Sequence, residues 1–190
     1  MAGKNVGVTL LSVVVAVSAF VASSIWRENL QDRIVKAHDA TQEWTQTYNS
    51  INDRSLVLGG EPAPTDLADT KQRLSRKLQF IKEVIGVIIP GLIRAQNVEG
   101  KLLKVNEDML DHYGQLAQQS LDIKSLNQAV ALDNEATGLL GKEIELGVLL
   151  NSYALQQEED LEGRASYIKY IGYSLSVLAI IVAGIAQIAG

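Results

Sequence analysis

Few side chains in this 190-residue chain have the chemistry that catalysis or metal binding needs. Cysteine is absent and there are only two histidines, His38 and His112, which excludes disulfides, thiol nucleophiles and His-rich metal sites. His38 follows Arg33 by five positions, and an acidic cluster comes much later in the chain, at Glu158, Glu159, Asp160 and Glu162. We interpret the acidic cluster as a solvated helix face, with a divalent-cation site as the minor alternative, and we predict no metal centre.

The segment from Arg33 to His38 resembles the spaced Arg–His signature of HEPN-type ribonucleases, which are small helical bundles. That resemblance implies RNA cleavage with Arg33 and His38 at the site. However, Ile34 stands where the family usually has a polar residue, and a five-residue step places two side chains roughly 140° apart on a helix. The net charge of −5 also disfavours contact with a phosphate backbone. A membrane-tethered ribonuclease is therefore the remote alternative.

Other functional motifs do not occur in the sequence. It contains no P-loop, dinucleotide fingerprint, His-Glu-x-x-His pair or EF-hand loop. Neither histidine has the neighbours that a catalytic triad requires. We therefore expect no enzymatic activity, no cofactor, no small-molecule substrate and no nucleic-acid partner.

The segment from Tyr170 to Gly190 contains twenty-one residues without a charge. About twenty such residues cross the ~30 Å apolar core of a bilayer as a helix. Tyr167, Lys169 and Tyr170 at its start are typical of the lipid–water interface, where aromatic rings and the stems of long basic side chains are favoured. We predict a transmembrane helix over residues 167–190.

A second uncharged run of twenty-one residues extends from Val6 to Trp26, and Arg27 follows it. A signal peptide cleaved after Ala19 is the alternative, but the apolar run continues past that site and ends in the interfacial pair Trp26 and Arg27. We predict a transmembrane helix over residues 1–26. Lys and Arg are more frequent on the central side of both spans, which predicts a cytoplasmic central region.

Small residues recur in both spans at the spacing that allows close helix packing in lipid. We predict packing contacts, within one chain or between chains, at Ser12, Ala16, Ala19, Ser23, Gly172, Ser176, Ala179 and Ala183. After the first span the apolar positions alternate in steps of four and three, which is the seam of a packed helix. The seam comprises Leu30, Ile34, Ala37, Thr41, Trp44, Tyr48 and Ile51.

The central residues 27–166 are predicted to form a long-helix bundle with coiled-coil-like seams. We expect one helix from about Val6 to Tyr48, a loop at about residues 49–66 that contains Gly59-Gly60 and two prolines, and a cap at Thr65 or Asp66. Residues 80–93 are too short an apolar run to span, so a buried core helix bent at Pro90-Gly91 is expected; a re-entrant segment is the alternative. A second stripe, from Leu132 to Tyr153, predicts a break or a change of partner near Asp133-Asn134.

The sequence thus predicts an all-α membrane protein with two transmembrane helices flanking a helical bundle. The function we expect is that of a non-enzymatic integral membrane subunit, which self-associates or docks onto other membrane subunits in the bilayer through its helical seams. The alternative is an oligomeric pore lined by Ser12, Ser18 and Ser23 or by Ser174, Ser176 and Gln187. Neither span carries a charged ring, which weakens the case for a selective channel.

Overall fold

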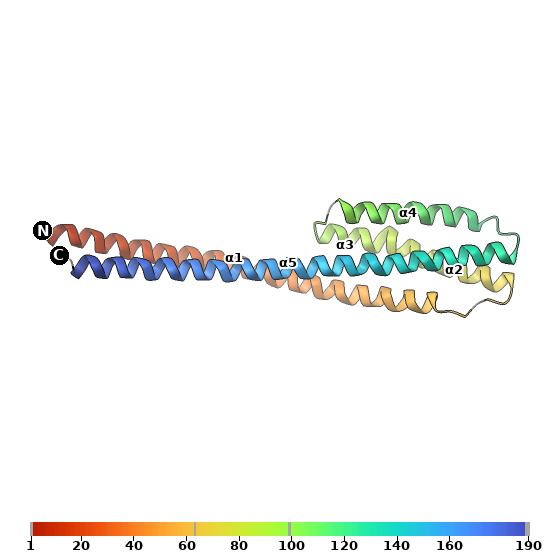
Figure 1. Ribbon diagram of the computed structural model, residues 1–190, viewed down its shortest axis with the longest axis horizontal. Coiled ribbons are helices and arrows are strands. Elements are labelled where there is room, and N and C mark those ends of the chain that lie inside the picture. Colours follow the sequence, from red (N-terminus) through yellow and green to blue (C-terminus); the bar gives the residue numbers. More distant parts are fainter. Residues whose placement is uncertain (1, 63, 99, 189–190) are drawn as a thin grey trace. The chain divides into compact units, whose positions relative to one another are not determined.

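The computed structural model describes the backbone of residues 2–62, 64–98 and 100–188, and the side chains of residues 6–7, 9–62, 64–98 and 100–185. The end of the second predicted span, at Ala189 and Gly190, lies outside these ranges, as do the side chains of Lys4 and Gln187. Throughout the described ranges the elements are helical and no strand occurs (Figure 1). They are α1 (Ala2–Gly59), α2 (Leu67–Glu83), the π-helical turn η1 (Val84–Ile88), α3 (Ile89–Ala95), α4 (Lys101–Ser120) and α5 (Leu126–Ile188).

This confirms the all-helical class, and two of the helices are long and apolar enough to cross a membrane, α1 and α5. The chain divides into two compact units. We call residues 1–40 and 156–190 the helix pair, and residues 41–155 the bundle.

The bundle contains four antiparallel rods: the α1 segment 41–59, the consecutive elements α2, η1 and α3, then α4, then the α5 segment 126–155 (Figure 1). Contacts between side chains join each rod to its neighbours. Tyr48 of α1 packs against Gly147 of α5, and the Arg54 guanidinium lies 4.4 Å from the centre of the Phe80 ring of α2. α4 packs on both α2 and α3. The connections are short, as expected for an up-down bundle.

The bundle core contains the apolar stretch at residues 80–93. Phe80, Ile81, Val84, Ile85 and Ile89 are at most 3 % exposed there. The predicted buried core helix is therefore confirmed, and this burial by protein counts against the re-entrant alternative. The stripe from Leu132 to Tyr153 also faces the core, with Leu139, Leu146 and Leu150 at most 1 % exposed.

The turn η1 explains how a helix accommodates Pro90. Proline has no N–H, and its ring collides with the carbonyl four residues earlier in a regular helix. Directly before it, the N–H of Ile89 bonds to the carbonyl of Val84, a five-residue step that widens the helix. The irregularity that we expected at Pro90-Gly91 therefore occurs one turn earlier, at residues 84–88.

The end of α1 lies later than predicted, at Gly59 instead of Tyr48, so the chain leaves the helix at Gly60 and not at Asn49. The loop was predicted from Gly59-Gly60 and the two prolines, and the helix does end at these signals; the preceding residues 49–55 are rich in Asn, Ser and Asp, which are weak helix formers. Tertiary packing outweighs this preference, since Ile51 and Ser55 continue the seam and are buried. The Asp66 carboxylate caps α2 as predicted, accepting a hydrogen bond of 2.8 Å from the Asp69 N–H.

The prediction of a helix break near Asp133-Asn134 was wrong, because α5 passes through both residues without interruption. The chain breaks earlier, between Ser120 and Leu126. There the Ser125 hydroxyl accepts from the Gln128 N–H at 3.3 Å, and the Gln128 side chain accepts from the Lys124 N–H at 3.1 Å. This is a variant of the Ser-x-x-Gln capping box, a local signal that the sequence contains.

Candidate membrane-interface site

Small residues make the contact between the two apolar segments of the helix pair. Gly172 lies so close to α1 that a Cβ at this position would overlap the Ser23 side chain. The Ser176 hydroxyl bonds to the Gly172 carbonyl at 2.8 Å and lies 3.4 Å from the Ala16 carbonyl oxygen. Ser12 and Ala179 are each 8 % exposed. Of the small residues predicted for helix packing, Ala16 and Ser23 of α1 therefore lie against Ser176 and Gly172 of α5.

The same seam continues along both partners of the pair. Ala16, Ala19 and Ser23 are half-buried on α1, and so are Leu30, Ile34 and Ala37 further along. On α5, Gly172 is buried while Ser176 and Ala183 are half-buried. The seam positions Trp44 and Tyr48 belong to the bundle, where Trp44 is 1 % exposed and its ring centre lies 6.3 Å from that of Tyr48.

Outside this narrow seam the apolar segments face outwards. Of the most apolar 18-residue window, only 6 % of residues are buried in α1 and 11 % in α5. The large exposed side chains include Leu10, Leu11, Val14, Phe20, Leu178 and Ile180. An apolar surface of this extent on a soluble monomer is rare, and it needs lipid or another protein to cover it.

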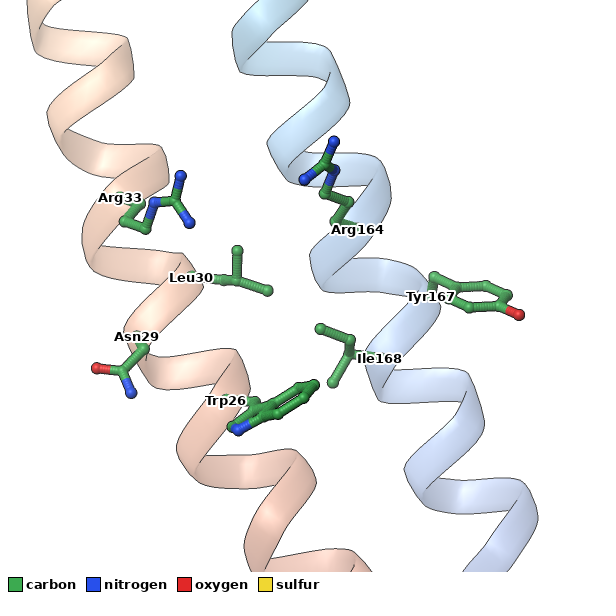
Figure 2. Close-up of a pocket in the computed structure, with 7 residues that line it drawn as sticks. All are labelled: Trp26, Asn29, Leu30, Arg33, Arg164, Tyr167 and Ile168. Atoms are coloured by element: carbon green, nitrogen blue, oxygen red, sulfur yellow. The ribbon is translucent and has the colours of Figure 1, made fainter.

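A pocket of about 440 Å³ opens between α1 and α5 at the polar end of these segments (Figure 2). Its lining residues are Trp26, Asn29, Leu30 and Arg33 from α1 and Arg164, Tyr167 and Ile168 from α5. Figure 2 shows Trp26, Leu30 and Ile168 directed into the space between the helices, while Tyr167 points away from it. The guanidinium groups of Arg33 and Arg164 extend toward that space from opposite helices (Figure 2).

The two arginines of this pocket lack an acidic partner. Neither Arg33 nor Arg164 forms an ion pair within the part of the chain whose side chains are described, and no carboxylate lines the pocket. A second groove of the helix pair differs in this respect. It contains Arg27 and Lys169 together with the carboxylate of Glu162. We call the first pocket the arginine pocket and the second the mixed-charge groove.

The predicted interfacial anchors are all on the surface of the helix pair. Trp26, Tyr167 and Tyr170 are 66 %, 67 % and 69 % exposed, and Arg27 and Lys169 are exposed as well. Each of these residues is predictable singly from the sequence. The shared pocket of Arg33 and Arg164 is not, because a helical period gives the face of each residue but not the partner opposite it.

His38 has a partner of its own in the helix pair. Its Nδ1 lies 2.7 Å from Glu158 Oε1, and the hydrogen bond and charge of Glu158 raise the pKa of His38, with smaller contributions from Asp39 and Glu162. Arg33 lines the arginine pocket, which does not include His38. The structure thus gives a partner to His38 of the ribonuclease-like segment and places Arg33 in a pocket that His38 does not line. No set of three or more His, Asp or Glu side chains in the described ranges is arranged to hold a metal ion.

The bundle contains a buried ionic cluster that fixes α2 against α5. Lys77, 1 % exposed, lies 2.9 Å from Asp133 and donates to the Thr137 hydroxyl at 2.8 Å. Arg73 lies 3.2 Å from the other Asp133 oxygen and 3.3 Å from Glu61, and it donates to the Pro62 carbonyl. Asp133 thus faces two cations on α2. The charges compensate one another, so we interpret the cluster as structural.

Glu143 on α5 is the one carboxyl group in the described bundle that is both fully buried and unpartnered. It is 1 % exposed, and neither carboxyl oxygen has a hydrogen-bond partner among the described residues. Burial raises the pKa of Glu143 to about 8, so the side chain stays protonated at neutral pH. Its flanking sequence gave no sign of this, since the neighbouring Lys142 and Glu145 are ordinary surface residues.

Comparison with protein-family models, with curated proteins and with solved structures finds no match to this chain.

Proposed function

We propose that this protein is a non-enzymatic integral membrane subunit, anchored by the apolar segments of α1 and α5, whose bundle serves as a scaffold for partner subunits or further copies. The observation that carries the proposal is the exposure of those segments: 94 % and 89 % of their most apolar windows lie outside the protein interior. Lipid is the solvent in which such a surface is stable. The Lys and Arg bias around the spans favours a cytoplasmic bundle.

The scaffold role rests on how the span hydroxyls are used. Ser23 bonds to the Phe20 carbonyl at 2.9 Å, Ser176 bonds to the Gly172 carbonyl, and Ser12 is buried in the seam. Ser12, Ser23 and Ser176 thus lie at the contact between α1 and α5, whereas Ser18 and Ser174 are exposed. The use of the first three serines in helix packing favours a scaffold over the alternative of an oligomeric pore.

The bundle also offers a surface on which a partner helix could dock. A groove of about 300 Å³ between α4 and α5 is lined by Val105, Met109, Leu146 and Leu149, with Asp108, Lys142 and Glu145 at its sides. Val148, Leu149 and Leu110 are between 41 % and 54 % exposed. Apolar floors with charged rims are typical of helix-in-groove recognition.

Two measurements on the full chain test the proposal. Alkaline carbonate extraction of membranes should leave the chain in the pellet, and light scattering in mild detergent should give a protein mass above the 20.6 kDa of one chain. A chain that stays soluble and monodisperse without detergent would contradict membrane insertion. A 20.6 kDa monomer that recovers no partner would contradict the scaffold role alone. Current across a planar bilayer containing the inserted protein would support the pore instead.

A further inference from the structure

The arginine pocket brings two like charges together without neutralising them. Arg33 and Arg164 extend toward the same space from two helices, and neither has an acidic partner among the described side chains (Figure 2). Both side chains are exposed, and an anion that lies between two guanidinium groups gains charge-assisted hydrogen bonds from both. Their planar forks match the oxygens of a phosphate group.

The remaining walls of the pocket are apolar, which restricts the class of anion. Trp26, Leu30 and Ile168 point into the space below the two guanidinium groups (Figure 2). Trp26 also ends the uncharged run of the first span, so the pocket continues directly into the apolar surface of the helix pair. A small phosphate ion would leave this apolar wall uncovered. A phosphate that carries acyl chains would cover both parts.

The mixed-charge groove contains a carboxylate, which the arginine pocket lacks. There, Arg27 and Lys169 share their groove with Glu162, so a carboxylate of the protein itself offsets part of the positive charge. The exposed aromatic and basic residues at this level of the helix pair are those that favour the headgroup region of a bilayer. Unneutralised arginines at headgroup depth favour lipids with a net negative charge.

We infer that the arginine pocket binds the phosphate of an anionic glycerophospholipid, with Arg33 and Arg164 as the phosphate ligands and with Trp26, Leu30 and Ile168 against the glycerol and the upper acyl chain. The inference rests on the proposed insertion of the helix pair into a membrane. It adds a lipid-specific site to that anchor, so the attraction of the chain to the membrane depends on lipid charge as well as on apolar area.

The test uses the full chain inserted in nanodiscs with equal amounts of phosphatidylglycerol and phosphatidylcholine, released into neutral detergent for native mass spectrometry. The wild type should retain phosphatidylglycerol in preference to phosphatidylcholine. Arg33→Gln with Arg164→Gln should lower this preference about tenfold, as the loss of two charge-assisted contacts implies. The matched control, Arg27→Gln with Lys169→Gln, removes the same number of positive charges and should change the preference less than about twofold.

Additional variants and conditions distinguish the possible reasons for a negative result. Arg33→Lys with Arg164→Lys keeps the charge but removes the forks, and it should retain a part of the preference; helix content by circular dichroism confirms that each variant is folded. Equal retention of both lipids by the wild type, or equal losses in the two Gln variants, would overturn the inference. Displacement of the lipid by millimolar inorganic phosphate would assign the pocket to a free anion instead. Carbonate extraction of the same variants reports membrane insertion separately, so an inserted chain without lipid preference contradicts only this site.

Discussion

The helices α1 and α5 contribute to both the bundle and the helix pair, but their apolar side chains are buried in the bundle and largely exposed in the helix pair. In the bundle, Leu146 and Leu150 of α5 are at most 1 % exposed, whereas Leu178 of the same helix is 62 % exposed in the helix pair. Both units have a seam with steps of three and four residues. The difference lies outside the seam, where the bundle has charged and amide side chains and the apolar segments of the helix pair have mostly Val, Leu and Ile. The seam residues therefore determine which helix packs against which, and the residues outside the seam determine whether the surface is suited to water or to lipid.

The two units also differ in the size of the side chains within the seam. Gly147 of the bundle receives the Tyr48 ring, while Gly172 of the helix pair receives the small Ser23 side chain. A large ring gains from leaving water, which is the main driving force in an aqueous core. In lipid that force is absent, and close backbone approach between small residues takes its place.

Removal of Asp133 is the substitution that we expect to destabilise the bundle most. Asp133→Ala should lower the free energy of unfolding of the bundle by about 3–5 kcal/mol, because the buried Lys77 would lose its carboxylate partner and the buried Arg73 would keep only Glu61. Urea unfolding followed by circular dichroism in mild detergent measures it. The control is Glu83→Gln, which removes an exposed ion pair with Arg54 at 3.9 Å and should cost less than about 1 kcal/mol. Similar losses in both variants would show that the cluster is not buried.

The same substitution placed in each unit tests whether water surrounds one and lipid the other. Leu146→Ala should destabilise the bundle by about 2–5 kcal/mol through the cavity it leaves. Leu178→Ala should change unfolding of the bundle by less than about 0.5 kcal/mol, since its side chain faces outwards. Urea unfolding in the same detergent gives the unfolding free energies of the two variants for comparison. A large loss in the Leu178 variant would mean that protein, not lipid, covers this face.

Glu143 makes the stability of the bundle depend on pH. The carboxyl group ionises near 4.5 when unfolded and near 8 when folded, so the folded state binds more protons between these values. Stability is therefore greatest below pH 4.5 for this group and falls as the pH rises, by up to about 1.4 kcal/mol per pH unit until about 8. From pH 6 to pH 8 the wild type should lose about 2 kcal/mol more than Glu143→Met.

The control for this pH dependence is Glu135→Gln, a change at an exposed position of the same helix. Its unfolding free energy should follow the wild-type curve. Parallel curves for Glu143→Met and the wild type would contradict a buried, protonated Glu143.

Gly172→Ala should weaken the contact within the helix pair by about 1–2 kcal/mol, because the new Cβ would force Ser23 and its backbone outwards. The chain has no cysteine, so Ala16→Cys with Ser176→Cys reports the contact by its rate of disulfide formation. Gly172→Ala should slow this rate severalfold. Gly184→Ala, where a Cβ meets nothing within 4 Å, should leave it unchanged; an equal rate in both variants would show that the segments do not pack closely.

Much of the fold follows from local sequence signals. Uncharged runs define the apolar segments, and every predicted seam position from Leu30 to Ile51 is buried or half-buried, because a helix face depends only on spacing. Helix ends were less predictable. α1 continues past Tyr48 because Ile51 and Ser55 are buried by distant segments, and weak local preference does not show this.

The arginine pocket and the ionic cluster depend on contacts between residues far apart in the chain. Arg73 and Lys77 stand four residues apart on α2, within an otherwise apolar stripe, which was a usable sign of burial. Their partner Asp133 comes from another helix. Arg33 and Arg164 likewise meet only because α1 and α5 run antiparallel, and no pattern in either segment specifies that pairing.

The hydrogen bond of 3.2 Å between Thr45 and Asn151 joins positions 106 residues apart. Once the bundle has folded, the chain between these residues is a closed loop, and most of the entropy lost in bringing distant segments together has already been lost. The apolar segments on either side then meet at a high effective concentration instead of searching for one another. A weak contact between Ser23 and Gly172 is sufficient under these conditions, and each copy should pair its own two segments before it exchanges them with a neighbour.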